Sequence, residues 1–184
     1  GAVAGALGKS LMGGAVTEVC AGRVLQLAKQ LRGAGKMEYF QPLCFTQYVL
    51  VTPEGNPAGI ASIQDMAKKG VRVMLPLGAS PPGGDAVVGI LKKAGIEQDV
   101  MKNMVKNESC VVRMMSELVK GKGDVSIVEK RLPSMERFAG QVEVLPIDEA
   151  LFPPGPLTFT IGVMKYAQDR ALADDYVSFI RSEE

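Results

Sequence analysis

The chain has 184 residues, of which 21 are Lys or Arg and 20 are Asp or Glu, so its formal net charge is +1. This balance gives no electrostatic reason to expect nucleic acid as a partner, and no apolar run reaches the roughly 20 residues that membrane insertion requires. Histidine is absent, which excludes Ser-His-Asp and Cys-His catalysis. The three cysteines lie far apart and have no metal-ligand spacing, so we expect no metal, no cofactor and no enzyme activity.

In the first third of the chain, helices alternate with strands. The start resembles a secretion signal, but Lys9 interrupts it, so we interpret residues 2–12 as a helix of the mature protein. The patterns then predict a strand over 15–20, a helix over 22–33 and a strand over 47–53.

The remainder of the chain continues this alternation. Ser62 and Asp65 resemble a capping box, and the apolar run around Val73 predicts a strand. Further helices are predicted over 86–93, near 96–104 and after Ser109, which can act as the helix cap, and further strands over 124–129, 141–146 and 157–164. The last helix is amphipathic, with an apolar face of Ala171, Leu172, Tyr176, Phe179 and Ile180. This order predicts an α/β fold with largely parallel sheets.

The sequence GASPPGGD, residues 78–85, joins a predicted strand to a predicted helix through a loop of small residues. Such a loop at a helix N-terminus allows a ligand to contact backbone N–H groups. The alternative is that Gly and Pro only turn the chain here.

Several phrases, taken in order, resemble the periplasmic molybdate-binding proteins of ABC importers, which are two-lobed solute-binding proteins. The strongest is VTPEGNPAGI, residues 51–60, with the helix that follows it. SPPGGDA (80–86), VVRMMSELVKGKGD (111–124) and GALGKSL (5–11) follow the family's pattern more weakly. The resemblance covers nearly the whole chain.

The resemblance implies two α/β lobes with mainly parallel sheets, joined by two hinge crossovers. We expect lobe I to comprise residues 1–53 and 151–184, and lobe II residues 54–150, with the crossings at Pro53 and at 152–156. It also implies a molybdate- or tungstate-like oxyanion held between the lobes, an ABC permease as partner and a periplasmic or extracytoplasmic location. The ligand residues that the resemblance places in this sequence are Ala4, Gly5, Ser80, Pro82, Gly83, Gly84, Ser109, Cys110, Val111 and Glu129.

The sequence also departs from the family. Val3 and Ala4 replace adjacent serines, Pro82 lacks an N–H donor, and Glu129 stands in place of a tyrosine. A carboxylate beside a dianion repels it, although Glu129 could equally be a solvated charge at a strand end. The family's first strand and helix have no counterpart, so we expect either that the chain continues upstream of Gly1 or that another chain fills the gap.

A second function remains open, because the same fold serves as the effector-binding module of cytoplasmic transcriptional regulators. The free cysteines favour this alternative. The VTPEGNPAGI phrase favours the transport protein.

Overall fold

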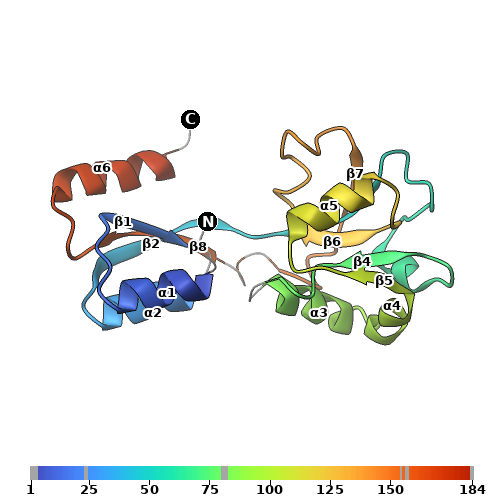
Figure 1. Cartoon of the computed structure of the whole chain (residues 1–184), viewed down its shortest axis with the longest axis horizontal. Coiled ribbons are helices and arrows are strands. Elements are labelled where there is room, and N and C mark those ends of the chain that lie inside the picture. Colours follow the sequence, from blue (N-terminus) through green and yellow to red (C-terminus); the bar gives the residue numbers. More distant parts are fainter. Residues whose placement is uncertain (1–3, 23–24, 80–82, 154, 156–157, 183–184) are drawn as a thin grey trace. The chain divides into compact units, whose positions relative to one another are not determined.

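The computed structural model describes residues 4–22, 25–79, 83–153, 155 and 158–182. The chain divides into two units (Figure 1): unit 1 comprises Gly1–Thr46 and Gly155–Glu184, and unit 2 comprises Gln47–Pro154. The boundaries expected at residues 53 and 151 are therefore displaced. The strand at 48–53 pairs only with strands of unit 2, and the Phe152 ring packs edge-on against Tyr48 of unit 2 at 4.9 Å between centroids.

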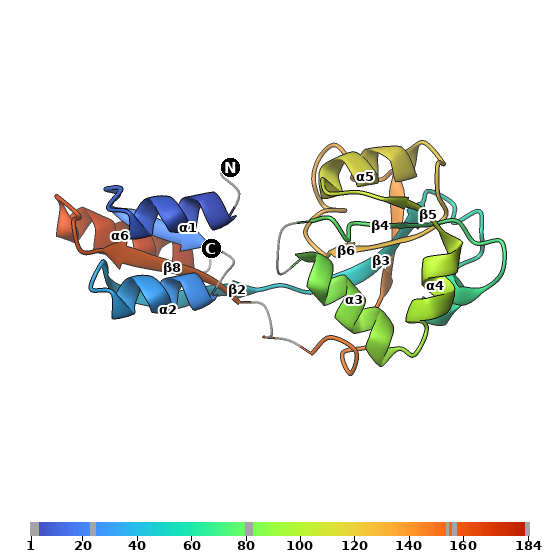
Figure 2. The ribbon, with the colours of Figure 1, turned by 60° about the horizontal axis from the view of Figure 1, so that its bottom comes forward.

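Unit 1 is a three-stranded sheet in the order β1-β8-β2. Figure 1 shows α6 on one side of this sheet and α1 and α2 on the other, and Figure 2 shows α1 and α2 next to each other. Both strand pairs are antiparallel. Its elements are α1 (Ala4–Met12), β1 (Val19–Gly22), α2 (Leu25–Gly33), β2 (Met37–Phe45), β8 (Thr158–Met164) and α6 (Arg170–Arg181).

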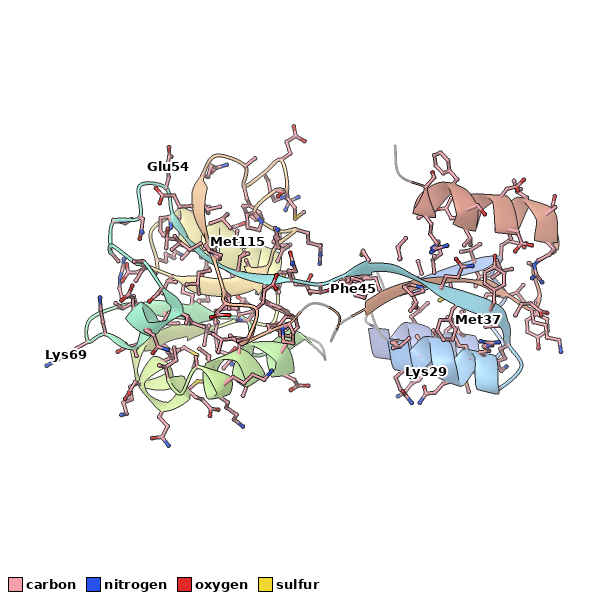
Figure 3. The ribbon with its side chains drawn as sticks, turned by 180° about the vertical axis from the view of Figure 1, so that it is seen from behind. Lys29, Met37, Phe45, Glu54, Lys69 and Met115 are labelled. Carbon is pink, nitrogen blue, oxygen red and sulfur yellow. The ribbon has the colours of Figure 1, made fainter. Side chains whose placement is uncertain are left out.

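The two faces of this sheet have separate cores. On one face, Leu31 of α2 is buried with Met37 and Met164, and Met37 is labelled in Figure 3. On the other face, Ala173 and Val177 of α6 pack with Ile161 and Val163 of β8. Because residues 163 and 164 alternate between faces, one central strand supports both cores.

Strand β2 was not predicted from the sequence. Its segment MEYFQPLCF contains Pro42, which argues against a strand because proline cannot donate to a ladder. The structure places β2 at a sheet edge, where proline is tolerated, and its pairing with β8 shifts register between Pro42 and Cys44.

Unit 2 contains two sheets, ordered β6-β3-β7 and β4-β5, linked by a parallel bridge between Val73 and Val125. In Figure 1, α5 lies on one side of these strands and α3 and α4 on the other. Its elements are β3 (Tyr48–Pro53), a 3₁₀ helix η1 (Ile63–Ala67), β4 (Val73–Leu75), α3 (Gly83–Lys93), α4 (Glu97–Asn103), β5 (Met104–Asn107), α5 (Val111–Val119), β6 (Ser126–Glu129) and β7 (Val142–Pro146).

The prediction of mainly parallel sheets was wrong. Among the strand pairs of the described residues, only β4–β5 is parallel, and the pairs within β1-β8-β2 and β6-β3-β7 are antiparallel. The path of the chain explains two of these antiparallel pairs, β2–β8 and β3–β7: the chain leaves unit 1 through β2 and enters unit 2 through β3, then leaves unit 2 after β7 and re-enters unit 1 through β8. An outgoing and a returning strand that pair within one unit run in opposite directions.

The core of unit 2 follows the predicted faces. Met114, Met115 and Leu118 of α5 are fully buried against strands β3, β4 and β6, and Met115 is labelled in Figure 3. The predicted capping box is present, but it starts a short 3₁₀ helix: the Asp65 carboxylate accepts the N–H groups of Ala61 and Ser62 at 2.7 and 2.9 Å.

Candidate functional site

Three strands of unit 2 end at the same edge. β4 pairs in parallel with β5, and Val73 of β4 bridges in parallel to Val125, directly before β6. The carboxyl ends of these strands are Leu75, Asn107 and Glu129. In open α/β sheets, the carboxyl ends of parallel strands are where ligands bind. With about 4.8 Å between neighbouring strands, the outer two ends lie roughly 10 Å apart.

The loops that follow β4 and β5 are in contact. A Cβ placed on Gly78 would lie 3.2 Å from the Cα of Ser109, so only glycine allows this approach without a shift. The Gly78 N–H donates to Asn107 Oδ1 at 3.1 Å, and the Glu108 N–H donates to the Leu75 carbonyl at 3.0 Å. The two loops that precede α3 and α5 therefore form one structure.

Helix α3 begins at Gly83, and Gly83 and Gly84 are both buried. A side chain on Gly84 would collide with the carbonyl oxygen of Leu77, in the loop that leads into the helix. The glycines thus permit close backbone packing as well as a turn. Ser80 and Pro82, which were also predicted as ligand residues, lie outside the described residues.

Helix α5 begins differently from the prediction. Cys110, not Ser109, is its N-cap, and the cap makes no side-chain hydrogen bond. Instead the Glu108 carboxylate accepts the Ser109 N–H at 3.0 Å and the Cys110 N–H at 3.5 Å. The Ser109 cap predicted from the sequence was wrong, because a carboxylate one residue earlier satisfies these donors. Val111, the first residue of the helix, is half-buried.

Glu108 is only 9% exposed, and its carboxylate lies near two cationic side chains. Its carboxylate lies 3.9 Å from Lys106 Nζ and 3.7 Å from the Arg113 guanidinium. Lys106 also pairs with Glu117, whose pKa is lowered chiefly by that hydrogen bond. An internal carboxylate therefore already accepts the Cys110 N–H, which was expected to bind a ligand, and the neighbouring Ser109 N–H.

Glu129 is buried, at 7% exposure, and is not the solvated charge considered from the sequence. Its Oε2 accepts from Arg131 Nε at 2.7 Å. In the ladder, Glu129 lies opposite Tyr48, the first residue of β3. The negative charge that was expected to repel a dianion is thus compensated by a neighbouring guanidinium.

A cavity of about 340 Å³ opens at this same edge of unit 2. Tyr48 and Phe152 line it together with Pro146, the last residue of β7. Lys130 also lines it, with its ammonium 3.1 Å from Gln47 Oε1. Sequence reasoning missed these residues, because they come from four separate segments that only the strand pairing brings together.

The two remaining predicted residues, Ala4 and Gly5, are the first residues of α1 in unit 1. Within the described part of the chain, no cluster of three or more Cys, Asp or Glu side chains could hold a metal ion. Nor does any described helix combine the length and apolarity needed to cross a membrane.

These features define a class: an α/β protein of two units in which helices start at the carboxyl ends of parallel strands. The family model for bacterial extracellular solute-binding proteins matches residues 1–184, and the chain belongs to this family. The family is one of binding proteins rather than enzymes, and it does not favour the alternative of a cytoplasmic regulator module. No curated protein sequence matches the chain.

Solved structures share the fold. The chain is similar to the substrate-binding domain of a candidate molybdenum ABC transporter from Clostridium difficile, with a TM-score of 0.83, 17% identity and coverage of 99% of this chain and 78% of that one. It is also similar to the periplasmic molybdate-binding protein of Azotobacter vinelandii, with a TM-score of 0.74, 16% identity and coverage of 98% of this chain and 79% of that one. The sulfate-binding protein SubI of Mycobacterium tuberculosis matches with a TM-score of 0.67, 15% identity and coverage of 98% of this chain and 69% of that one. At these identities, the similarity shows the fold alone.

Proposed function

We propose that the protein is the periplasmic solute-binding component of an ABC importer and that it carries a small tetrahedral oxyanion such as molybdate or tungstate to its permease. The observation that carries this proposal is the contact between Gly78 and Ser109, which joins the loops before α3 and α5. Two helix N-termini thereby begin at one edge of unit 2, beside the ends of three parallel strands. The oxyanion-binding relatives support the choice of ligand class.

The physical reason is the charge distribution at a helix start. Each N-terminus presents unpaired N–H groups and a partial positive charge of roughly half an elementary charge. Two such ends attract a dianion without a fixed salt bridge, so the anion can also be released. In this proposal, the backbone of Gly83, Gly84 and Val111 donates to the anion, while Ala4 and Gly5 remain predicted contributors from unit 1.

Glu108 modifies this mechanism. Its carboxylate holds the N–H groups of Ser109 and Cys110, so a dianion that uses these donors must displace it. Lys106 and Arg113 then compensate the displaced carboxylate. We expect weaker affinity than a helix start without an internal carboxylate would give.

Val111→Pro tests the role of the α5 backbone. Proline is tolerated at the first position of a helix, so this variant removes one N–H donor without removing the helix. Titration calorimetry with molybdate, tungstate, sulfate and phosphate should show binding weakened about ten- to a hundredfold, as expected for one lost charge-assisted hydrogen bond. Val111→Ala keeps the N–H and is the matched control. If both variants bind as the wild type does, or if no oxyanion at millimolar concentration raises the melting temperature, the proposal fails.

Glu108→Gln tests the internal carboxylate. The amide keeps an acceptor but loses the charge, so we expect a dianion to bind about tenfold more tightly. Glu117→Gln removes one charge from the same cluster without touching the helix N–H groups, and it should leave the affinity within about twofold. Equal effects of both variants would show that only the general electrostatic field matters.

A further inference from the structure

Glu108 places an acidic side chain at a point where the proposed ligand is itself an anion. Its carboxylate is held by the N–H groups of Ser109 at 3.0 Å and Cys110 at 3.5 Å. Lys106 and Arg113 lie 3.9 and 3.7 Å from the same carboxylate, which is almost fully buried. A ligand at the start of α5 therefore meets a fixed hydrogen-bond acceptor as well as N–H donors.

The contacts of Glu108 leave part of its acceptor capacity unused. A carboxylate has two oxygens with about four lone-pair sites, and both helix N–H groups go to Oε1 of Glu108. Its Oε2 lies 3.9 Å from Lys106 Nζ, a distance that makes an ion pair but is too long for a hydrogen bond. Glu108 Oε2 can therefore accept a proton-bearing group of a ligand while the present contacts persist.

An anion that shares one of these N–H groups must lie close to the carboxylate of Glu108. Two acceptors on the same donor are each about 3 Å from its nitrogen, so their oxygens are on the order of 3–5 Å apart. Two unprotonated oxygens repel each other at this distance, whereas a protonated ligand oxygen donates a hydrogen bond to the carboxylate. The protonation of the ligand therefore decides whether Glu108 repels it or binds it.

Tetrahedral oxyanions fall into two groups by this criterion. Near neutral pH, phosphate and arsenate keep at least one proton, whereas sulfate, selenate, molybdate and tungstate are fully ionised. Phosphate and sulfate are nearly equal in size, and so are arsenate and selenate, so the proton and not the size separates the members of each pair. A site that hydrogen-bonds a ligand hydroxyl strongly rejects an analogue without one, because the buried polar group is then left unpaired.

We infer that Glu108 makes the site selective for protonated tetrahedral oxyanions, phosphate or arsenate, over fully ionised ones. This selectivity rests on the proposed function, and it ranks molybdate, tungstate and sulfate as the weaker ligands of that site. Glu108 accepts the hydroxyl of the ligand, and the N–H groups of Gly83, Gly84 and Val111 bind its unprotonated oxygens.

Glu129 is a second buried carboxylate at the same edge of unit 2. It ends β6, whereas Glu108 follows β5, and β4 lies between these two strands. Arg131 Nε donates to Glu129 Oε2, while the N–H groups at the start of α5 donate to Glu108. Glu108 is therefore the carboxylate that an anion at this helix start contacts, and Glu129 provides a matched comparison.

Titration calorimetry at about pH 6 with phosphate, sulfate, arsenate, selenate and molybdate tests the selectivity. We expect phosphate to bind at least about tenfold more tightly than sulfate, and arsenate than selenate. Both ligands of a pair are measured on the same preparation, so a partly unfolded fraction does not change the ratio of their affinities. Sulfate or molybdate binding as tightly as phosphate would overturn the selectivity and leave the proposed function standing. Absence of binding by all five anions would overturn both.

Glu108→Gln assigns the selectivity to one side chain. The amide keeps the size of the side chain but loses its charge, so phosphate should bind about tenfold more weakly and sulfate about tenfold more tightly. Glu129→Gln is the matched control and should leave the ratio of the two affinities within about threefold of the wild-type value. A Glu108→Gln variant that changes both affinities in the same direction and by the same factor would contradict the inference, as would a reversed preference in Glu129→Gln alone.

Discussion

In unit 2, three strands are completely covered, and only the edge strands β5 and β7 among its described strands remain partly open. Every residue of β3, β4 and β6 is buried. In unit 1, β2 buries only Met37, and α6 leaves four apolar side chains exposed. The comparison shows that the unit that carries the loops of the candidate site has a closed core that can hold them rigidly, whereas the described residues of the other unit leave apolar side chains of α6 exposed.

The largest effect that tests this comparison is expected for Gly84→Ala. The new Cβ would meet the Leu77 carbonyl, and neither backbone segment can move easily in a closed core. We expect unit 2 to lose about 1–3 kcal/mol of stability, measured as faster hydrogen exchange confined to residues 47–154. Gly89→Ala in the same helix meets nothing within 4 Å and should stabilise by about 0.5–1 kcal/mol. Similar destabilisation by both alanines would show that the close contact of Gly84 with Leu77 is not the cause.

A matched change in unit 1 sharpens the comparison. A Cβ on Gly162 of the central strand β8 would meet the Tyr39 carbonyl, so Gly162→Ala should raise exchange in unit 1 and leave unit 2 unchanged. Spread of the effect into both units would mean that they unfold together.

The next effect is a pH-dependent one in unit 2. The hydrogen bond from Lys68, followed by those from the N–H groups of Ala61 and Ser62, lowers the pKa of Asp65 to about 2. Because the folded pKa lies below the unfolded value of about 3.9, the stabilisation is complete well above pH 4 and is lost as the pH falls through about 2.

Asp65→Asn should therefore cost about 1–2 kcal/mol at pH 7 and less at pH 3, as measured by urea unfolding. Asp148→Asn, in an exposed turn, is the control with little effect at either pH. A cost for Asp65→Asn that does not change between pH 7 and pH 3 would show that the carboxylate charge is not responsible.

The smallest effect is expected in unit 1 for Tyr39→Phe. The Tyr39 hydroxyl donates to Asp174 Oδ1 at 2.7 Å and so ties β2 to α6. Burial and this hydrogen bond raise the pKa of Tyr39. We expect a loss of about 1 kcal/mol, together with the loss of one hydroxyl that titrates above the ordinary range of tyrosine in an ultraviolet pH titration. Tyr166→Phe, at a residue that is 48% exposed, is the control. If this variant instead loses the hydroxyl that titrates at high pH, that hydroxyl does not belong to Tyr39.

Much of the fold could be predicted because apolar periodicity follows burial. The face of α5 with Met114, Met115 and Leu118 was predicted correctly for this reason. The same logic failed for α6, where several apolar residues lie on a side that the fold leaves open. It also missed β5, because a four-residue strand with alternating polar residues has no distinctive pattern.

The candidate site was harder to predict than the fold. The loop before α3 was found from its glycines, but Glu108 was not considered, since a carboxylate just before a cap has no distinctive sequence signal. Burial of Glu129 and its pairing with Arg131 depend on the strand β3 that lies opposite. Such properties follow from tertiary contacts and cannot be obtained from neighbours in sequence.

The late position of β8 in the sequence determines when unit 1 can form its sheet during biosynthesis. Unit 2 is one continuous segment, Gln47–Pro154, whereas the central strand of unit 1, β8, is made only after it. Until Thr158–Met164 leaves the ribosome, β1 and β2 have no strand between them, so unit 1 cannot form its sheet during most of translation. A chain exported while still unfolded would meet no obstacle from this late strand, and a chaperone that holds the newly made N-terminal segment would find the apolar residues of β1, α2 and β2 accessible.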